Sequence, residues 1–553
     1  MPTVSQILSA RVAGAFARAL HEEGWPGEAG PVEIERPGNP EHGDYATNVA
    51  MRSARTLRRA PQEIADAVVR RLQPDDVIAS AEVAGKGFIN IRLRPDWVAR
   101  QAAEVARAGD RYGRDDVLAG QRIQVEFISA NPTGPLHLAN ARGGPLGDAL
   151  ATVLAFLGAS VQREFYVEDT GTQFEMFGRS IGVRYRQLLG EDATLPEEGY
   201  QGEYVTEIAR TILASEGDRY QQLSLEEQAR VFAPLGVAWV VKDDQRVCEK
   251  LGIRFDTWFS QAEMMRSGYF DDTVRALRAL GTVYEKHGAV WFDAPDEIED
   301  KEGWVIVRRS GEPTYFGKDI AYHRLCLTER GLDKKIDIWG ANTHYHLIQM
   351  RAAMRALGLD DRFAVVLYQF VRFLHEDVIL GMSRRKGTFI TLEDVLDVIG
   401  KDATRFFLLQ RSADAQLDFD FELARQQSNE NPVYYVQYAH ARIASIFRTA
   451  AERGLGWDDA DPSLLIEPAE QELLKHCLRF PDLVLEVGGH YGVHLLTQYA
   501  VELAGDLHNF YKFNRVIAED LPRSKARLLL MRAVQVTVRQ TLDLLGISAP
   551  ASM

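Results

Sequence analysis

Hydrophobic and polar positions follow different spacings in successive parts of the 553-residue chain. The first 110 residues mix an amphipathic segment, a turn-rich stretch at 35–48 and the alternating run VAGKGFINIRL at 83–93, which predicts a strand. A helix is indicated by apolar residues at helical spacing: Ile64, Ala67, Val68 and Leu72. We therefore expect residues 1–110 to form a small α+β domain.

The middle of the chain alternates strand-like runs with helical stretches. The runs are QVEFIS, REFYVED, AVWFD, GWVIV, KIDIWG and RFAVVLYQFVRFL. This order predicts an α/β domain with a doubly wound parallel sheet over residues 111–414. Residues 175–265 are helix-rich and longer than a crossover needs, so we expect an insertion there. Strand-like runs stop after about residue 415, and helical segments predict an all-α domain over 415–553.

Composition narrows the class of protein without identifying it. Hydrophobic residues make up 46% of the chain and charged residues 26%, which excludes a tail or a fibre. No apolar run approaches the roughly 20 residues that a membrane span needs, so we expect a soluble, cytoplasmic protein. The net charge of -15 argues against a wholly basic nucleic-acid coat protein but allows a local basic face. Because Cys248, Cys326 and Cys477 are far apart and odd in number, we expect buried thiols.

The segment SANPTGPLHLAN, residues 129–140, follows an apolar run. Its prolines and Gly134 predict a strained, tight turn after a strand, with a helix starting near His137. The N–H groups at a helix N-terminus attract phosphate, and His137 and Asn140 would project from one face of that helix. A structural loop with a capping Asn is the alternative. Pro145, inside the expected helix, removes a backbone donor and predicts a kink or a late start.

A second segment, GMSRRKGTFITLEDVL at residues 381–396, places consecutive cations between two glycines. Such a loop can close over a polyphosphate and stabilise the charge that develops on a leaving pyrophosphate. Thr391 begins a sequence typical of a helix cap. A solvated run of charges is the alternative. The loop residues are Gly381, Met382, Ser383, Arg384, Arg385, Lys386 and Gly387.

Together these two segments resemble the His-Ile-Gly-His and Lys-Met-Ser-Lys-Ser signatures of class I aminoacyl-tRNA synthetases. Further segments resemble the arginyl-tRNA synthetase family in the family's own order and over essentially the whole chain: FYVEDTGTQ (165–173), GYQGEY (199–204), LGIRFDTWFS (251–260), YEKHGAVWFD (284–293) and SNENPVYYVQYAHARI (428–443). The resemblance implies a Rossmann-like catalytic domain between a small α+β domain that contacts the tRNA D-loop and an all-α anticodon-binding domain. It also implies ATP-dependent attachment of arginine to tRNA through an arginyl-adenylate.

The chain departs from the family's pattern at several positions. Asn140 stands where a second histidine is usual; it can donate a hydrogen bond but carries no charge. The second signature begins with Gly381 instead of lysine, and Arg384 takes the place of its other lysine. Glu168 stands where the family usually has Asn, and Gln261 stands where we expect an acid near the substrate guanidinium. These changes affect individual contacts and leave the expected activity unchanged.

The resemblance implies an arginine site. Asp319 can accept a bidentate, charge-assisted pair from a guanidinium, which the point charge of lysine matches less well, and Tyr315 offers a ring face. A helix start with an ordinary surface pair is the alternative for these two residues. The implied arginine-binding residues are Ser129, Asn131, His137, Gln261, Tyr315 and Asp319. Catalytic roles are implied for His137, Asn140, Arg384 and Arg385.

ATP is implied as a substrate, together with Mg²⁺. The segment GANTHYH, residues 340–346, follows the strand-like run KIDIWG, and ligands of open α/β sheets bind beyond the carboxyl ends of the strands. His344 and His346 could instead form a metal pair, but they have no third ligand nearby, so we expect no tightly bound metal. The implied ATP-binding residues are Pro132, Gly134, His137, Asn140, Gly340, His344, Met382, Ser383 and Arg384.

The implied partner is tRNA, and we expect the protein to act as a monomer. Phe88 could stack on a flipped base and Asn90 could bind its edge, although an aromatic residue in a strand is more often core. In the C-terminal part the implied tRNA-binding residues, some of which must be core, are Tyr438, His440, Arg442, Tyr511 and Arg515. The alternative functions are a nucleotidyltransferase of the same fold that does not act on tRNA and a catalytically impaired tRNA-binding paralogue.

Overall fold

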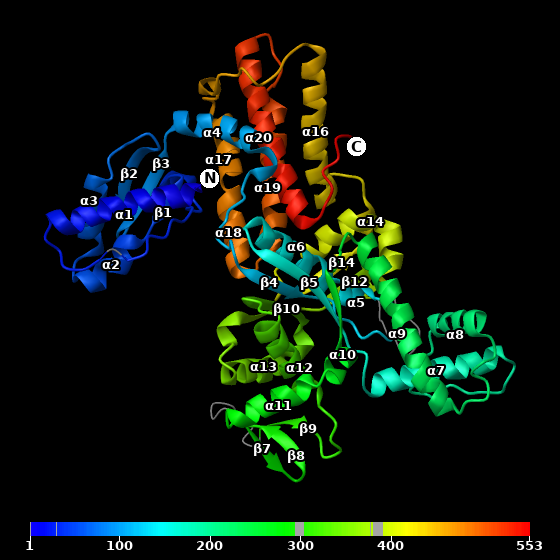
Figure 1. Ribbon diagram of the computed structural model, residues 1–553. Coiled ribbons are helices and arrows are strands. Elements are labelled where there is room, and N and C mark those ends of the chain that lie inside the picture. Colours follow the sequence, from blue (N-terminus) through cyan, green and yellow to red (C-terminus); the bar gives the residue numbers. More distant parts are fainter. Residues whose placement is uncertain (1, 29, 294–302, 376–377, 380–390) are drawn as a thin grey trace.

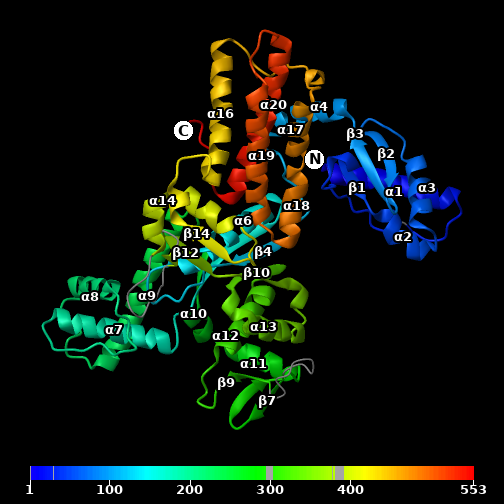
Figure 2. The ribbon, with the colours of Figure 1, turned by 180° about the vertical axis from the view of Figure 1, so that it is seen from behind.

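The architecture follows from a computed structural model that describes residues 2–28, 30–293, 303–375, 378–379 and 391–553. The C-terminal helices form a column above a central sheet, and the N-terminal domain lies beside that column (Figure 1). A helical unit and a small antiparallel sheet extend from the central sheet at separate places, which the view from behind also shows (Figure 2). Across the described parts of the chain, no helix combines the length and the apolar character needed to cross a membrane.

The N-terminal domain packs helices against a three-stranded antiparallel sheet of order β1-β3-β2. Its elements are α1 (Val4–Glu22), β1 (Tyr45–Thr47), α2 (Val49–Leu57), α3 (Pro61–Arg71), β2 (Ile78–Ala84) and β3 (Phe88–Leu93). The single strand expected over 83–93 is wrong, because β2 and β3 form a hairpin whose turn contains Gly85 and Gly87 with φ of 56° and 113°. Both values lie in the left-handed region that favours glycine, so the chain reverses there.

The central sheet is parallel, as the alternation of strand-like and helical runs predicts. Its order is β11-β10-β4-β5-β6, from the strands β4 (Arg122–Glu126), β5 (Ser160–Val167), β6 (Thr257–Ser260), β10 (Lys334–Gly340) and β11 (Phe363–Tyr368). Helix α6 (Gly143–Phe156) contacts β4, β5 and β10. Apolar residues such as Val125, Phe165 and Ile336 are buried in the same core as this helix. The side chains that alternate with them point to the opposite face of the sheet.

Two of the expected parallel strands belong to a separate sheet. AVWFD and GWVIV form β8 (Ala289–Phe292) and β9 (Trp304–Val307), which join β7 (Val283–Lys286) in an antiparallel sheet. His287 and Gly288 connect β7 to β8 with φ of 52° and 77°. Positive φ at both central residues is the geometry of a tight hairpin turn, which pairs neighbouring strands with each other and not with the central sheet.

The expected insertion is a helical unit with its own core. Helices α7 (Thr172–Leu188), α8 (Glu203–Glu216) and α9 (Leu225–Lys250) bury Phe177, Tyr185 and Phe232 among them. The chain then returns to the central sheet as β6, which lies inside the range 175–265 and was not expected as a strand. This strand has four half-buried residues at the sheet edge, too few to produce a clear alternation. Helices α10 (Gln261–Arg266) and α11 (Tyr269–Ala279) follow.

The remaining strands of the described chain form a third three-stranded sheet. That sheet has the order β13-β12-β14 and contains β12 (Val371–His375), β13 (Val378–Ile379) and β14 (Leu417–Asp420). Because β14 pairs with β12, the expectation that strands stop near residue 415 is wrong by this one strand. The remaining helices are α4 (Pro95–Ala108), α12 (Tyr315–Arg324), α13 (His344–Ala356), α14 (Leu392–Leu409), α15 (Phe421–Arg425), α16 (Pro432–Glu452), α17 (Pro468–Leu478), α18 (Phe480–His490), α19 (His494–Phe513) and α20 (Leu521–Leu545). All three cysteines are buried and free, as expected.

Candidate active site

The turn after β4 carries backbone strain, but not at the glycine that the sequence suggests. Ile128 and Ser129 have φ of 67° and 38°, unusual values for residues with side chains, above all for a β-branched one. Gly134 has no such value; a Cβ there would lie 2.8 Å from the hydroxyl oxygen of Tyr204. The Tyr204 hydroxyl donates to the Thr133 carbonyl at 2.8 Å. Gly134 is therefore small to admit this tyrosine, and it and Pro132 are both buried.

Ser129 fixes the strained backbone at the carboxyl edge of the sheet. Its hydroxyl donates to Glu126 Oε1 at 2.9 Å and accepts from the backbone N–H of Tyr166 at 3.1 Å. These bonds tie the end of β4 to β5. Strained conformations of this kind persist only where surrounding contacts fix them, and they concentrate at functional sites.

The helix that follows this turn is broken near its start, as Pro145 predicts. Helix α5 (Leu138–Ala141) ends at Arg142, and α6 begins at Gly143. Pro145 has no N–H to donate to the Ala141 carbonyl four residues earlier, so a continuous helix is disfavoured. The side chain of Asn140 lies outside what the structure describes, and its expected contact with ATP stays a prediction.

His137 lies beside Thr391, which comes four residues after the cationic loop in the sequence. The backbone of His137 pairs with that of Thr391, and the N–H of Leu392 donates to the Leu136 carbonyl at 2.9 Å. Thr391 caps α14 in a reciprocal capping box with Asp394, which confirms the predicted cap. The residues expected to stabilise pyrophosphate, Gly381, Met382, Ser383, Arg384, Arg385 and Lys386, lie outside the described residues, and their roles remain predictions.

Tyr315 and Asp319 share one face of α12, where a third residue joins them. Asp319 is 5% exposed, and its Oδ2 lies 2.7 Å from His346 Nε2. The ring of Tyr315, 49% exposed, lies 4.8 Å from the His346 ring. The sequence placed His346 in the segment expected near ATP, with a metal pair as the alternative, and did not place it beside Asp319. Its position in the first turn of the helix that follows a central strand was the available signal that it reaches the site.

Gln261 is connected to this group through Tyr166. It is fully buried, its Oε1 accepts from the Tyr166 hydroxyl at 2.8 Å, and its amide contacts Thr170. Burial raises the pKa of Tyr166, and the carboxylates of Asp319 and Glu168 raise it further. Burial also raises the pKa of Glu168, against the opposing effect of the Lys318 ammonium. We call Tyr166, Glu168, Gln261, Tyr315, Asp319 and His346 the Asp319 cluster.

The remaining residues expected to bind substrate lie around the same edge. The Asn131 amide donates to Gln173 Oε1 at 2.9 Å. Strand β10 ends at Gly340, and a single 3-10 turn leads into α13, which begins at His344, so the expected loop is a helix N-terminus. His344 is exposed there. In the described part of the chain no group of three or more His, Cys, Asp and Glu residues could hold a metal ion.

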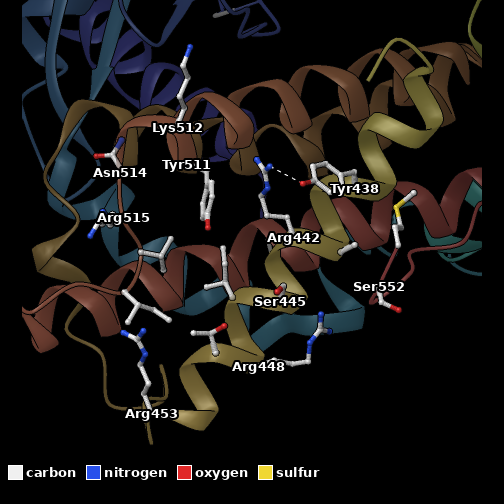
Figure 3. Close-up of a pocket in the computed structure, with 16 residues that line it drawn as sticks. Tyr438, Arg442, Ser445, Arg448, Arg453, Tyr511, Lys512, Asn514, Arg515 and Ser552 are labelled. Carbon is white, nitrogen blue, oxygen red and sulfur yellow. Dashed lines mark hydrogen bonds between the residues drawn. The ribbon is translucent and has the colours of Figure 1, made fainter. Parts of the chain in front are cut away.

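Four of the residues expected to contact the anticodon, Tyr438, Arg442, Tyr511 and Arg515, line a cavity of about 790 Å³ between α16, α19 and the C-terminal segment. The guanidinium of Arg442 lies 4.7 Å from the ring centre of Tyr438 and 4.9 Å from that of Tyr511, and it donates to the Tyr438 hydroxyl at 3.1 Å. Figure 3 shows the two rings on either side of Arg442. The other cations of this lining are Arg448, Arg453, Lys512 and Arg515, and no Asp or Glu is among the residues that line it. We call this the Arg442 cavity.

Two residues expected to contact tRNA are not accessible. Asn90, in the middle strand of its sheet, is 5% exposed. His440 is 6% exposed, and its Nδ1 lies 2.8 Å from the Pro550 carbonyl oxygen, under the C-terminal segment. Neighbouring elements cover both side chains in this structure, so their expected contact with tRNA stays a prediction. Phe88 is 38% exposed at the start of its strand and remains available.

Comparisons with known proteins agree with this architecture. Residues 6–93 match the model of the arginyl tRNA synthetase N terminal domain, 108–418 that of the catalytic domain of tRNA synthetases class I (R), and 436–553 that of the DALR anticodon binding domain. An arginine–tRNA ligase of Geobacter sp. (strain M21) is 43% identical over 95% of this chain and 96% of its own length. One from Carboxydothermus hydrogenoformans is 41% identical over the full length of both chains.

Solved structures of similar fold also include arginyl-tRNA synthetases. The arginyl-tRNA synthetase of Thermus thermophilus superposes with a TM-score of 0.79 over 99% of this chain and 100% of its own, at 24% identity. A structure described as a putative arginyl t-RNA synthetase from Campylobacter jejuni reaches 0.76 over 83% of this chain and 100% of its own, at 30% identity. The central domain is the catalytic domain of a class I synthetase. Within that class, the chain belongs to the arginyl-tRNA synthetase family.

Proposed function

We propose that this protein attaches L-arginine to its tRNA with ATP, and that the Asp319 cluster binds the guanidinium of the substrate. The burial of Asp319 carries this assignment. A buried carboxylate needs charged or strongly hydrogen-bonded partners. His346 Nε2 contacts one oxygen of Asp319, a guanidinium can pair with the other, and a second carboxylate, Glu168, acts on the same cluster. A guanidinium supplies the positive charge and several donors in a planar fork, which lysine does not. Gln261 then needs no charge of its own, because Glu168 and Asp319 already provide it.

The reaction has two steps. An oxygen of the arginine carboxylate attacks the α-phosphorus of ATP, the bond from that phosphorus to the bridging oxygen breaks, and pyrophosphate leaves. The 2'-hydroxyl of the terminal tRNA adenosine then attacks the activated carbonyl, and AMP leaves. ATP enters as its magnesium complex, so the substrate carries the metal ion. The enzyme contributes positioning and charge stabilisation.

The strained turn holds the reacting end of the substrate. In this proposal Ser129 and Asn131 bind the amino and carboxylate ends of arginine, and His137, the residue that precedes α5, binds ATP. The N–H groups at the starts of α5 and α13 favour phosphate. Asn140, Met382, Ser383, Arg384 and Arg385 complete this proposal from the sequence resemblance.

The tRNA would contact two surfaces. The Arg442 cavity offers cations and aromatic rings in one place, the combination that binds unpaired bases and phosphates. Phe88 offers a ring on the N-terminal domain. We further propose that the protein acts in the cytoplasm as a monomer.

Charging of bulk tRNA tests this function. With ATP and tRNA, the protein should attach radiolabelled arginine and leave lysine unattached. A nucleotidyltransferase of the same fold would transfer nothing to tRNA, and a catalytically impaired paralogue would bind tRNA without charging it. Either result would overturn the proposal.

A further inference from the structure

One face of the central parallel sheet is polar along its three middle strands, β10, β4 and β5, although such sheets are usually apolar on both faces. The register places Lys335 and Asp337 of β10 beside Gln124 and Glu126 of β4. The next strand continues the row with Gln162 and Glu164. Helix α12, which carries Asp319, covers this face through contacts such as that of the Tyr322 hydroxyl with Glu164 at 2.6 Å. The sheet therefore contains a buried polar layer directly beneath the Asp319 cluster.

Lys335 is at the centre of this layer. It is fully buried, and its Nζ lies 2.6 Å from Glu126 Oε2 and 2.7 Å from Asp337 Oδ1. The same nitrogen donates to Gln124 Oε1 at 3.0 Å and lies 4.5 Å from the ring centre of Tyr322. Burial alone would lower the pKa of Lys335, but the Asp337 and Glu126 carboxylates outweigh burial and raise it. The lysine is therefore charged, and it holds two carboxylates on neighbouring strands.

Each carboxylate reaches a different part of the candidate site. The other oxygen of Glu126 accepts from the Ser129 hydroxyl at 2.9 Å, at the strained turn. Asp337 Oδ2 lies 2.6 Å from His323 Nε2, and His323 Nδ1 lies 2.8 Å from the main-chain oxygen of Asp319. A carbonyl only accepts, so Nδ1–H is the donor of that bond. Lys335 is thus connected to Ser129 by one chain of contacts and to the backbone of Asp319 by another.

We propose that Lys335 is a positioning residue for arginine recognition. Through Glu126 it holds Ser129, and through Asp337 and His323 it holds the backbone of Asp319, so the segments for the two ends of the substrate are fixed relative to each other before arginine binds. This inference rests on the proposed function. Misplacement of binding groups by about 1 Å can lower catalytic efficiency about 100-fold, which gives such a support its effect.

Stability alone does not require this arrangement. Replacing a buried ion pair with neutral residues of similar volume is often neutral or stabilising, whereas removing one partner leaves an uncompensated charge. A single Lys335→Met variant therefore tests folding as much as function. The double variant Lys335→Met/Glu126→Gln removes one positive and one negative charge, leaves Asp337 with its contact to His323, and is the main test.

The experiment measures the KM for arginine, the KM for ATP and kcat in tRNA charging, together with the thermal unfolding midpoint. We expect the double variant to unfold within a few degrees of wild type, with an arginine KM raised about tenfold and with an ATP KM and a kcat changed less than about threefold. A double variant that keeps the wild-type arginine KM overturns the inference. So does an equal rise of both Michaelis constants, which indicates general loosening.

Glu470→Gln is the matched control. Glu470 is equally buried and accepts from Arg527 Nε at 2.8 Å, but it lies in the C-terminal helices. The Glu470→Gln variant should lower the unfolding midpoint and leave the arginine KM unchanged. A rise in its arginine KM as large as that of the double variant would overturn the inference. Asp319→Asn, measured beside it, separates the two proposals. If Asp319→Asn raises the arginine KM and the double variant does not, only the role of Lys335 is wrong.

Discussion

The Asp319 cluster and the Arg442 cavity have opposite electrostatic character: the cluster is acidic and the cavity is basic. The cluster holds the buried carboxylate of Asp319 on α12 and the half-buried carboxylate of Glu168 directly after β5, and so suits a small cation. The cavity exposes cations and rings between helices and so suits a large polyanion. The first depends on fixed geometry in a dry site, and the second on accessible charge that salt screens. The net charge of -15 predicts neither region, because it sums charges over the whole chain and each region depends on a few local residues.

The largest expected effect falls on the cluster. Asp319→Asn keeps the side-chain shape and removes the charge. The activation free energy derived from kcat/KM for arginine should therefore rise by about 2 to 4 kcal/mol. The ATP KM should change little. Steady-state charging kinetics with each substrate varied in turn measure both. Equal losses for the two substrates would mean that Asp319 supports the fold and does not bind arginine.

The next effect belongs to the cavity. Arg442→Ala removes the cation between Tyr438 and Tyr511, so tRNA affinity should fall by about 1 to 3 kcal/mol and the slope of affinity against salt should become less steep by about 1. Fluorescence titration with tRNA at several salt concentrations measures this. Arg539→Ala, a half-exposed cation outside the cavity, is the control. If both variants weaken tRNA binding equally, the cavity is not a specific contact.

A pH profile distinguishes the two regions further. Burial raises the pKa of Glu168, so this carboxyl takes up its proton at a higher pH than a free glutamate and then no longer attracts a guanidinium. The arginine KM should therefore rise as pH falls, starting at a higher pH than the titration of a free glutamate would give, while tRNA affinity follows no such trend. Glu168→Asn, which restores the residue usual in the family, should flatten the profile. An unchanged profile in that variant would remove Glu168 from the site.

The smallest effect concerns the N-terminal domain. Phe88→Ala should weaken tRNA binding by about 1 kcal/mol, because the ring is only partly exposed and would stack on a single base. The arginine KM should stay at the wild-type value. Binding of intact tRNA and of an isolated anticodon stem-loop, compared side by side, locates the contact. A loss for the stem-loop as well would contradict a contact with the D-loop.

Local patterns predicted much of this molecule. The parallel sheet, the helical C-terminal part, the cap at Thr391 and the interruption near Pro145 each follow from residues close together in the chain. Tyr315 and Asp319 are one helical turn apart, so their common face was predictable from spacing.

Pairings between distant segments were not predictable in this way. His346 meets Asp319 only because α12 and α13 pack together, and β8 pairs with β7 and not with the central sheet. Lys335 and Glu126 are far apart in sequence and face each other because of the strand register. The expectation that Gly134 permits a strained turn was also wrong. Its small size is needed because Tyr204 of α8 packs against it.

Discrimination between arginine and citrulline tests the account most directly, because citrulline keeps the shape of arginine and lacks its charge. In ATP-dependent charging of tRNA, wild type should prefer arginine over citrulline by at least about 100-fold in kcat/KM. Asp319→Asn should reduce this preference to about tenfold or less, because the charge that the substrate meets is gone. If the variant kept the full wild-type preference, the guanidinium would bind elsewhere and the central assignment would be wrong.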